Sequence, residues 1–246
     1  MYCYLYDDYI QENKKFEKEL LRVENRLTDL GIAGKISRLA LFRNAEEMIR
    51  DEIERGVQTV VVVGNDDTIR KVINVLSDSR VVLGIIPIGP MNELARMMGI
   101  PEGVAACDVL SARRVESIDV GTINGRKFIT GIRIPDFKAE LMANDGRFRI
   151  VATSRSVLEI RNLQDASDPC DGTLHAVIQS QVKDRGLFGR MRTTESILPF
   201  QSLAIRSDKS ITLLADGQPM EGLRFDIGIE PHTLRVITGK ERIFNP

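Results

Sequence analysis

The sequence has no tryptophan, only three cysteines, and almost no excess of charge of either sign. The 34 basic and 35 acidic residues leave a net charge of -1, which argues against a nucleic-acid binder that depends on bulk positive potential. So few cysteines, odd in number, exclude a disulfide scaffold. Because Cys3, Cys107 and Cys170 also lack the short spacing of a metal site, we expect buried, reduced thiols.

Long apolar runs are also absent. No segment approaches the roughly 20 apolar residues that a membrane-spanning helix needs, and Met1–Asp8 lacks the basic region of a secretory signal. These absences predict a cytoplasmic protein with at most peripheral membrane contact. The hydrophobic content of 43% is too high for a disordered chain, and the length of 246 residues fits one large domain or two small ones.

Helix-like and strand-like patterns alternate up to about residue 114. Gly31 follows an apolar stripe at helical spacing, and Asn44 with Glu47 indicates a helix start. The β-branched run Val60–Val63 is typical of a parallel strand buried on both faces. The patterns predict helices at 16–30, 44–56, 69–76, 92–98 and 104–110, and strands at 36–41, 60–63 and 81–86. We therefore predict a doubly wound α/β domain over residues 1–114.

The period of the pattern changes after about residue 114. Asn124-Gly125, typical of a type I′ turn, and Asp145-Gly146 each separate two strand-like runs and predict hairpins. Further alternating runs lie at 174–182, 201–206, 210–215, 225–229 and 233–237. The sequence thus predicts an antiparallel β-sandwich domain over residues 115–246, which makes the fold class α/β + all-β.

Two loops leave predicted strands and enter predicted helices, Gly64–Thr68 and Pro87–Glu93. Ligands of open α/β sheets bind where the strands end, and helix N-termini favour anions. The alternative is that the polar residues of these loops only cap helices. Neither loop is a Walker A sequence or a Rossmann glycine fingerprint.

In order and spacing, the two loops resemble the catalytic domain shared by diacylglycerol kinases, sphingosine kinases and soluble bacterial lipid kinases. That family has a Gly-Gly-Asp-Gly-Thr loop after a Val-rich strand, followed by a Pro-x-Gly-Thr-x-Asn-Asp loop. The corresponding stretches here are VVVVGNDDTIRKVINVL and LGIIPIGPMNELARMMGIP. IDVGTINGRKFITGI is similar to the hairpin that enters the family's β-domain, Asp168–Leu174 to its Asp-Gly-x-Leu segment, and Leu214–Gln218 to its Asp-Gly-Glu turn. NAD kinases share the glycine-rich loop and a β-rich C-terminal half, and are a related possibility.

The resemblance implies ATP-dependent phosphoryl transfer to a lipid hydroxyl, with ATP and Mg²⁺ as cofactors and a nucleotide and a lipid as partners. Its catalytic residues would be Asp66, which would also organise the metal, together with Asp216 and Gln218 where the lipid enters. The residues implied in nucleotide binding are Gly64, Asn65, Asp67, Thr68, Arg70, Lys71, Gly89, Asn92 and Glu93.

Several residues depart from the family pattern. Asp67 replaces a glycine, and a carboxylate about 5 Å from a phosphate charge costs on the order of 3 kcal/mol at an effective dielectric of 20. Arg70 and Lys71 either offset that charge or point to solvent. Gln218 stands where the bacterial lipid kinases have a glutamate thought to be the general base, and losing such a base removes about 10² to 10⁴ of rate.

Pro90 and Met91 replace Thr and Gly in the second loop, which removes a backbone donor and a flexible position. These departures support an alternative of another class, a catalytically inactive relative that keeps the two-domain cleft as a binding or assembly protein. The N-terminal helix would also suit a homodimer. The basic and apolar segment Lys183–Arg192 fits a peripheral membrane contact, a partner surface or a solvated loop.

Overall fold

The computed structural model describes the chain apart from residues 40–43, 152–155, 165–167, 184–190 and 245–246. Most of the segment considered above as a membrane or partner contact, Lys183–Arg192, therefore lies outside the described residues. The chain forms two compact units, one made of residues 1–118 and 232–246 and the other of residues 119–231.

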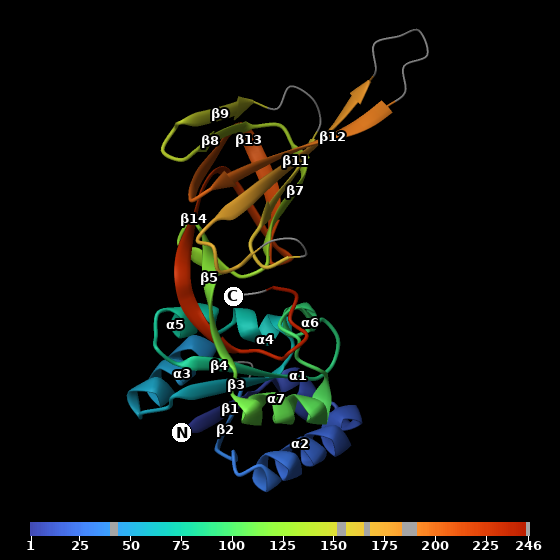
Figure 1. Ribbon diagram of the computed structural model, residues 1–246, viewed down its shortest axis with the longest axis vertical. Coiled ribbons are helices and arrows are strands. Elements are labelled where there is room, and N and C mark those ends of the chain that lie inside the picture. The colour runs from blue at the N-terminus through green and yellow to red at the C-terminus, as the bar shows by residue number, and fades with distance from the viewer. Residues whose placement is uncertain (40–43, 152–155, 165–167, 184–190, 245–246) are drawn as a thin grey trace. The chain divides into compact units, whose positions relative to one another are not determined.

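The first unit contains a parallel sheet with the strand order β2-β1-β3-β4-β14, in which neighbouring strands are parallel throughout (Figure 1). Its strands are β1 (Tyr2–Tyr6), β2 (Lys35–Arg38), β3 (Thr59–Gly64), β4 (Val82–Pro87) and the C-terminal end of β14 (Gln218–Ile237). Every residue of β3 and β4 is buried. The continuous apolar runs therefore identify central parallel strands, as predicted.

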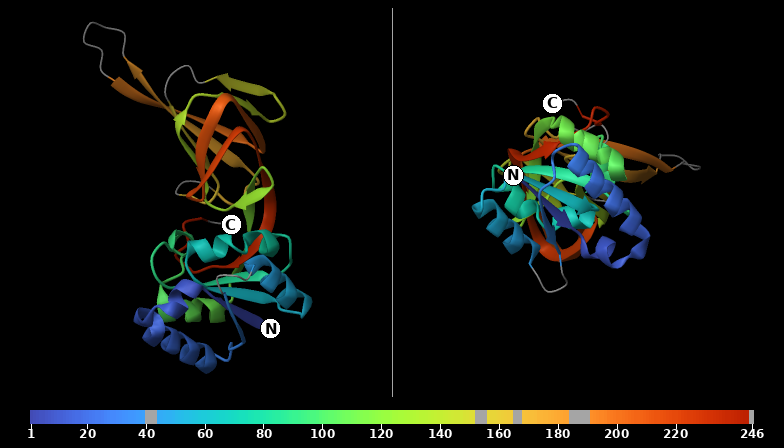
Figure 2. Two further views of the ribbon diagram at one scale, coloured as in Figure 1. Left: turned by 180° about the vertical axis from the view of Figure 1, so that it is seen from behind. Right: turned by 90° about the horizontal axis from the view of Figure 1, so that it is seen from below.

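Helices cover both faces of this sheet, with α2 and α7 on one face and α3 and α5 on the other (Figures 1 and 2). Gly31, at φ 68°, follows the end of α2, and the Asn44 side chain caps α3 by accepting from the Glu46 N–H at 2.9 Å. The stripe at 69–76 predicted one helix, but the structure has two short ones. The helical elements are α1 (Asp8–Glu12), η1 (Lys14–Phe16), α2 (Glu17–Asp29), α3 (Ala45–Glu54), α4 (Asp66–Arg70), α5 (Ile73–Ser77), α6 (Glu93–Met97), η2 (Gly103–Ala105) and α7 (Ala106–Ala112).

The strand β1 has no counterpart among the predicted elements. It lies between β2 and β3 and pairs with both, and its residues Cys3–Tyr6 are buried. The run Tyr2–Tyr6 is apolar but has none of the β-branched residues that mark Val60–Val63, so the strand was not among the predicted elements.

The end of β14 completes the parallel sheet, because Arg235 and Val236 pair with Val82 and Leu83 of β4. This pairing groups residues 232–246 with the α/β unit, whereas the sequence pattern assigned them to the β-domain.

The second unit is antiparallel β, with the strand order β12-β11-β10-β7-β13-β14, a β8–β9 hairpin paired with β13, and a β5–β6 hairpin paired with β14. Its core includes Phe128, Phe137, Phe200 and Phe225, each at most 1% exposed. The predicted fold class, α/β followed by an antiparallel β-sandwich, is therefore confirmed. The strands are β5 (Val115–Ile123), β6 (Arg126–Phe128), β7 (Gly131–Phe137), β8 (Glu140–Ala143), β9 (Phe148–Val151), β10 (Ser156–Arg161), β11 (Leu174–Lys183), β12 (Met191–Phe200), β13 (Ser202–Ala215) and β14.

Both predicted hairpins are present. Asn124 and Gly125 have φ values of 47° and 79°, as a type I′ turn requires. The runs at 201–206 and 210–215 predicted two strands, but they form the single strand β13, whose register with β14 shifts between Arg206 and Ile211. Polar residues at this irregularity interrupt the alternation without ending the strand.

Candidate functional site

Three parallel strands, β1, β3 and β4, bring the two predicted loops to one edge of the sheet. The pairing of β1 with β3 ends with Tyr6 beside Val63, and the pairing of β3 with β4 ends with Gly64 beside Pro87. Because these strands are parallel, their carboxyl ends form the edge at which α/β sheets bind ligands. The predicted loops therefore lie side by side.

The first loop is closed by hydrogen bonds within the chain. The Asn65 side chain caps α4 by accepting from the backbone N–H groups of Asp67 at 3.0 Å and Thr68 at 3.4 Å. The Thr68 hydroxyl donates to the Asp7 carboxylate. A Cβ atom at Gly64 would lie 2.8 Å from the Thr68 Oγ1, so only glycine fits there. The backbone N–H groups at the start of α4 and the Thr68 hydroxyl, which the resemblance implies would contact a phosphate, therefore form hydrogen bonds within the protein instead.

Asp66 joins the two loops. Its backbone N–H donates to the Met91 carbonyl at 3.0 Å, and its carboxylate accepts from the backbone N–H groups of Glu93 at 2.9 Å and Leu94 at 3.3 Å. The residue is 7% exposed. Burial raises the pKa of Asp66 to about 6, although these backbone donors act to lower it. Asp66 therefore serves as the cap of α6, a helix that begins in the other loop.

The second loop contains an unusual backbone position. Met91 has φ 65°, a left-handed conformation that glycine adopts more readily, and it is 57% exposed. The Asn92 Nδ2 donates to the Gly89 carbonyl at 2.6 Å, while its buried Oδ1 has no hydrogen-bond partner. Glu93 forms an exposed ion pair with Arg96 at 2.5 Å. The two side chains expected to face a nucleotide, Asn92 and Glu93, thus make local contacts.

The basic residues near the first loop face carboxylates. Arg70 forms an ion pair with Asp67, and its side chain is 22% exposed. The Lys71 Nζ lies 4.0 Å from the Asp8 carboxylate. Of the two alternatives that the sequence left open, Arg70 offsets the charge of Asp67, and Lys71 is directed at a different acidic residue. Neither cation faces a free anion site.

Asp7 and Asp8, at the end of β1, were not among the predicted site residues. Both carboxylates accept from the Tyr9 N–H at 2.9 Å. Burial raises the pKa of Asp7, and its hydrogen bond with Asp8 lowers the pKa of Asp8. The signal that could have found them is an apolar run, Tyr2–Tyr6, followed at once by polar residues, the same arrangement that identified the other two loops.

Asp216 and Gln218 belong to the second unit. Asp216 lies in the β13–β14 turn at φ 45°, and its carboxylate accepts from the backbone N–H groups of Ile129 and Thr130 at 2.8 Å and of Gly131 at 3.2 Å. The Thr130 hydroxyl donates to the same carboxylate at 2.5 Å. Gln218 is exposed and begins β14. Asp216 therefore anchors the turn to the chain that enters β7.

The segment Asp168–Leu174 also forms a turn held by carboxylates. The Asp171 side chain accepts from the Thr173 N–H at 2.8 Å. The Gly172 N–H donates to the buried Asp119 at 2.7 Å. These contacts are structural and lie within the second unit.

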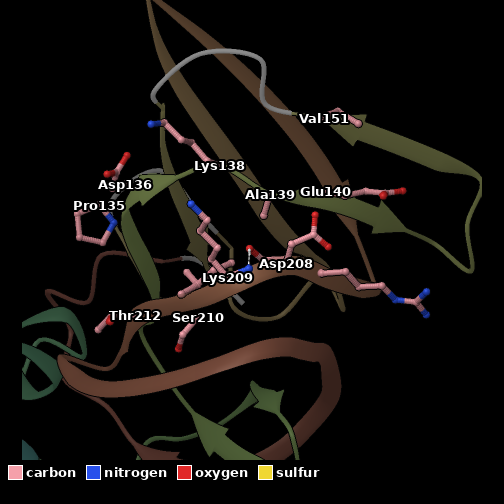
Figure 3. A pocket seen from close by; sticks show the side chains of 13 residues that line it. Pro135, Asp136, Lys138, Ala139, Glu140, Val151, Asp208, Lys209, Ser210 and Thr212 are labelled. Carbon is pink, nitrogen blue, oxygen red and sulfur yellow. Dashed lines mark hydrogen bonds between the residues drawn. The ribbon is translucent and has the colours of Figure 1, made fainter.

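The second unit also carries an open cavity of about 860 Å³ between β7, β8 and the irregular part of β13 (Figure 3). None of the predicted site residues lines it. Its charged lining residues are Asp136, Lys138, Glu140, Arg206, Asp208 and Lys209. Since the two signs are equal in number, this cavity shows no preference for an anionic or a cationic ligand.

The two loops offer a poor fit to ATP and Mg²⁺. Among the residues that the structure describes, no three His, Cys, Asp or Glu side chains are grouped as a metal site would require. Both oxygens of Asp66 accept backbone hydrogen bonds, and the first N–H groups of α4 are capped by Asn65. A triphosphate would also meet the carboxylates of Asp8 and Asp67 near these loops.

Comparison with known proteins finds similarity to lipid kinases. The family model of the diacylglycerol kinase catalytic domain matches residues 12–123. Diacylglycerol kinase of Bacillus subtilis is 30% identical over 118 residues, which are 46% of this chain and 39% of that protein. A probable YegS-like lipid kinase of Pseudomonas aeruginosa is 34% identical over 88 residues, 35% of this chain and 29% of the relative. These matches span about two fifths or less of the relatives' lengths.

More distant similarity extends along the chain. A probable YegS-like lipid kinase of Cronobacter sakazakii is 23% identical over 92% of this chain and 93% of its own length. The fold matches the crystal structure of a diacylglycerol kinase from Bacillus anthracis with a TM-score of 0.79 at 17% identity, covering 98% of this chain and 97% of that one.

No helix in the described part of the chain combines the length and apolar character needed to span a membrane. Proteins of the matched family are kinases, and the family implies the use of ATP and usually of a divalent metal. Residues 12–123 of the chain thus match the diacylglycerol kinase catalytic-domain family, and in this match and in the order of its motifs the chain is lipid kinase-like.

Proposed function

We propose that this protein is a non-catalytic member of its family, one that retains the kinase fold as a binding or assembly protein. The observation that carries the proposal is the position of Asp66. Its carboxylate is buried and caps α6 through the backbone N–H groups of Glu93 and Leu94. A side chain engaged in this way is poorly placed to hold a metal ion against a nucleotide.

Three further features support the proposal. Asn65 satisfies the N–H groups at the start of α4, and Thr68 donates to Asp7. Asp67 retains a carboxylate where the family has a glycine, and Arg70 is engaged with it. Gln218 cannot accept a proton at the position of the family's proposed base.

Assembly with a second copy is one form that this function would take. Leu21 of α2 is 58% exposed on a helix that otherwise buries Val23 and Leu27. A homodimer would cover this apolar side chain. Analytical ultracentrifugation of the wild type and of Leu21→Glu measures this directly, since a dimer formed through α2 would dissociate in the variant.

A second candidate function is ATP-dependent phosphoryl transfer to the hydroxyl of a lipid such as diacylglycerol. One observation favours it, the raised pKa of Asp66, which at about 6 lies in the range of a general base near neutral pH. In this reading ATP and Mg²⁺ would bind across the loops 64–68 and 87–93 after the α6 cap had opened. Asp216 and Gln218 would then lie on the lipid side.

Calorimetric titration with Mg²⁺·ATP, followed by a phosphate-transfer assay on a lipid panel, separates the two functions. We expect no heat of binding at millimolar ATP and no labelled lipid. Turnover that is lost in Asp66→Ala but kept in Asp51→Ala, an exposed aspartate of α3, would contradict the non-catalytic proposal and establish the kinase.

A further inference from the structure

A separate cavity of about 680 Å³ lies within the α/β unit. It is bounded by the end of α6, by α7 and by the segment that follows β14. Its volume falls in the range of roughly 300–1,000 Å³ that is usual for small-molecule sites. Apart from Arg96, its lining residues lie outside the elements that form the two loops and their helices.

Backbone contacts fix one side of this cavity. The Gly239 N–H donates to the Met98 carbonyl at 2.8 Å. A Cβ atom at Gly239 would lie 1.8 Å from the Gly99 carbonyl oxygen, and one at Gly99 would lie 2.5 Å from the Arg242 nitrogen. Two glycines therefore allow the chain after β14 to pack directly on the end of α6, which makes the cavity a preformed feature of the unit.

Part of the cavity lining is apolar. Its apolar lining residues are Ile100, Pro101, Val109, Ala112 and Ile243. Pro101 and Ala112 are exposed, and Val109 and Ile243 are only partly buried. These residues would gain from contact with an apolar ligand that covers them.

Other lining residues of the cavity offer unused donors. Arg114 and Lys240 are exposed and form no ion pair with any residue that the structure describes. Thr238 is 2% exposed, and its hydroxyl has no hydrogen-bond partner. The Thr238 N–H donates to the Arg114 carbonyl at 2.9 Å, which holds these two residues together.

The other charged lining residues are mostly occupied. Arg96 pairs with Glu93 at 2.5 Å, and Asp108 pairs with Arg26 at 2.5 Å. The charged lining residues that remain are Arg114, Lys240 and Glu241, so their net charge is positive.

We propose that this cavity is a binding site for an anionic amphiphile, a small molecule with one acidic head group and an apolar chain. The head group would pair with Arg114 and Lys240 and would accept from the Thr238 hydroxyl. The chain would lie along Ile100 and Val109. A carboxylic acid and a phosphate monoester both provide this chemistry, and the site does not depend on whether the protein binds nucleotide.

The test uses dodecanoate and dodecyl phosphate, each below its micelle concentration, as probes of the full chain. Calorimetry measures affinity, and backbone NMR locates the perturbed residues, which we expect at 96–101 and 238–243. Binding by either probe supports the site and identifies its head group. In Arg114→Gln/Lys240→Gln we expect binding to weaken about tenfold or more, because both charged hydrogen bonds to the head group are lost.

A matched control removes the same charge elsewhere. Lys18→Gln/Arg126→Gln changes two exposed cations outside the cavity and should bind as the wild type does. Ala112→Tyr fills the cavity without altering its charge and should also abolish binding. Wild-type affinity in both cavity variants, equal binding of dodecyltrimethylammonium, perturbations confined to other residues, or no binding at millimolar probe would each overturn the proposal.

Discussion

Asp66 and Asp216 are the two aspartates that the family resemblance marks as catalytic, and they lie in contrasting surroundings. Asp66 is 7% exposed, bridges two loops of the α/β unit and has a pKa raised to about 6 by burial. Asp216 is half-buried in a hairpin turn and accepts from three backbone N–H groups and one hydroxyl. The contrast teaches that both aspartates serve the fold in different ways: Asp66 joins two loops from a buried position, and Asp216 anchors a turn from a half-buried one.

The largest effect should come from Asp216→Ala. The substitution removes an acceptor shared by four donors and places alanine at φ 45°, so we expect the free energy of unfolding to fall by about 3–4 kcal/mol. Urea denaturation measures it. Asp208→Ala, an exposed position of the same hairpin strand β13, serves as the control and should change stability by less than about 0.5 kcal/mol. Equal losses in both variants would contradict the anchoring role of Asp216.

The next largest effect should be that of Asp66 on the pH dependence of the free energy of unfolding. Its folded pKa of about 6 lies above the ordinary value of 3.8, so the folded state binds the proton more tightly than the unfolded state. The resulting stabilisation is fully present below pH 3.8 and is lost as pH rises through about 6. We expect the wild type to lose about 2 kcal/mol relative to Asp66→Asn between pH 4 and pH 7. Parallel stability curves for the two proteins would show that Asp66 does not titrate in this way.

A smaller effect is expected for Asp67→Gly, which restores the family residue in the first loop. The change removes a carboxylate and releases Arg70, so the affinity for Mg²⁺·ATP should rise about tenfold, to a level that competition titration detects. Asp208→Ala, which removes one negative charge from the other unit, should leave affinity unchanged. If Asp67→Gly also leaves it unchanged, charge is not what weakens the loop.

The smallest effect should follow Gln218→Glu. Gln218 is exposed at the start of β14, so stability should change by less than about 0.5 kcal/mol. Because the loops of the α/β unit remain closed by their own hydrogen bonds, we expect no lipid phosphorylation in the variant. Turnover gained by this single change would show that only the base is missing.

The sequence predicts the alternation of helices and strands in the α/β unit well. Buried parallel strands such as Val60–Val63 form a continuous apolar run, and Gly31 and Asn44 mark the end of one helix and the start of the next. The Asn124-Gly125 hairpin is equally local. The sequence pattern does not predict elements whose place depends on pairing with segments far away in the chain. The strand β1 gains its identity from its pairing with β2 and β3, and the end of β14 gains its place from pairing with β4.

The candidate site shows the same limit. The sequence correctly predicts that the two loops lie together, because the strands that precede them are neighbours in the sheet. It cannot reveal that the carboxylate of Asp66 caps a helix 27 residues further along, or that Thr68 donates to Asp7 across the sheet. Whether a motif aspartate is available for chemistry depends on these tertiary hydrogen bonds, which the order of residues does not contain.

The pairing of β14 with β4 also has a consequence for biosynthesis. Strands β1 to β4 leave the ribosome before the whole antiparallel unit is made, yet their sheet lacks a strand until residues 235 and 236 have been added. During that interval part of the edge of β4 is unpaired, and unpaired strand edges favour association between nascent chains. The α/β unit is therefore the first to be synthesised and among the last to be finished.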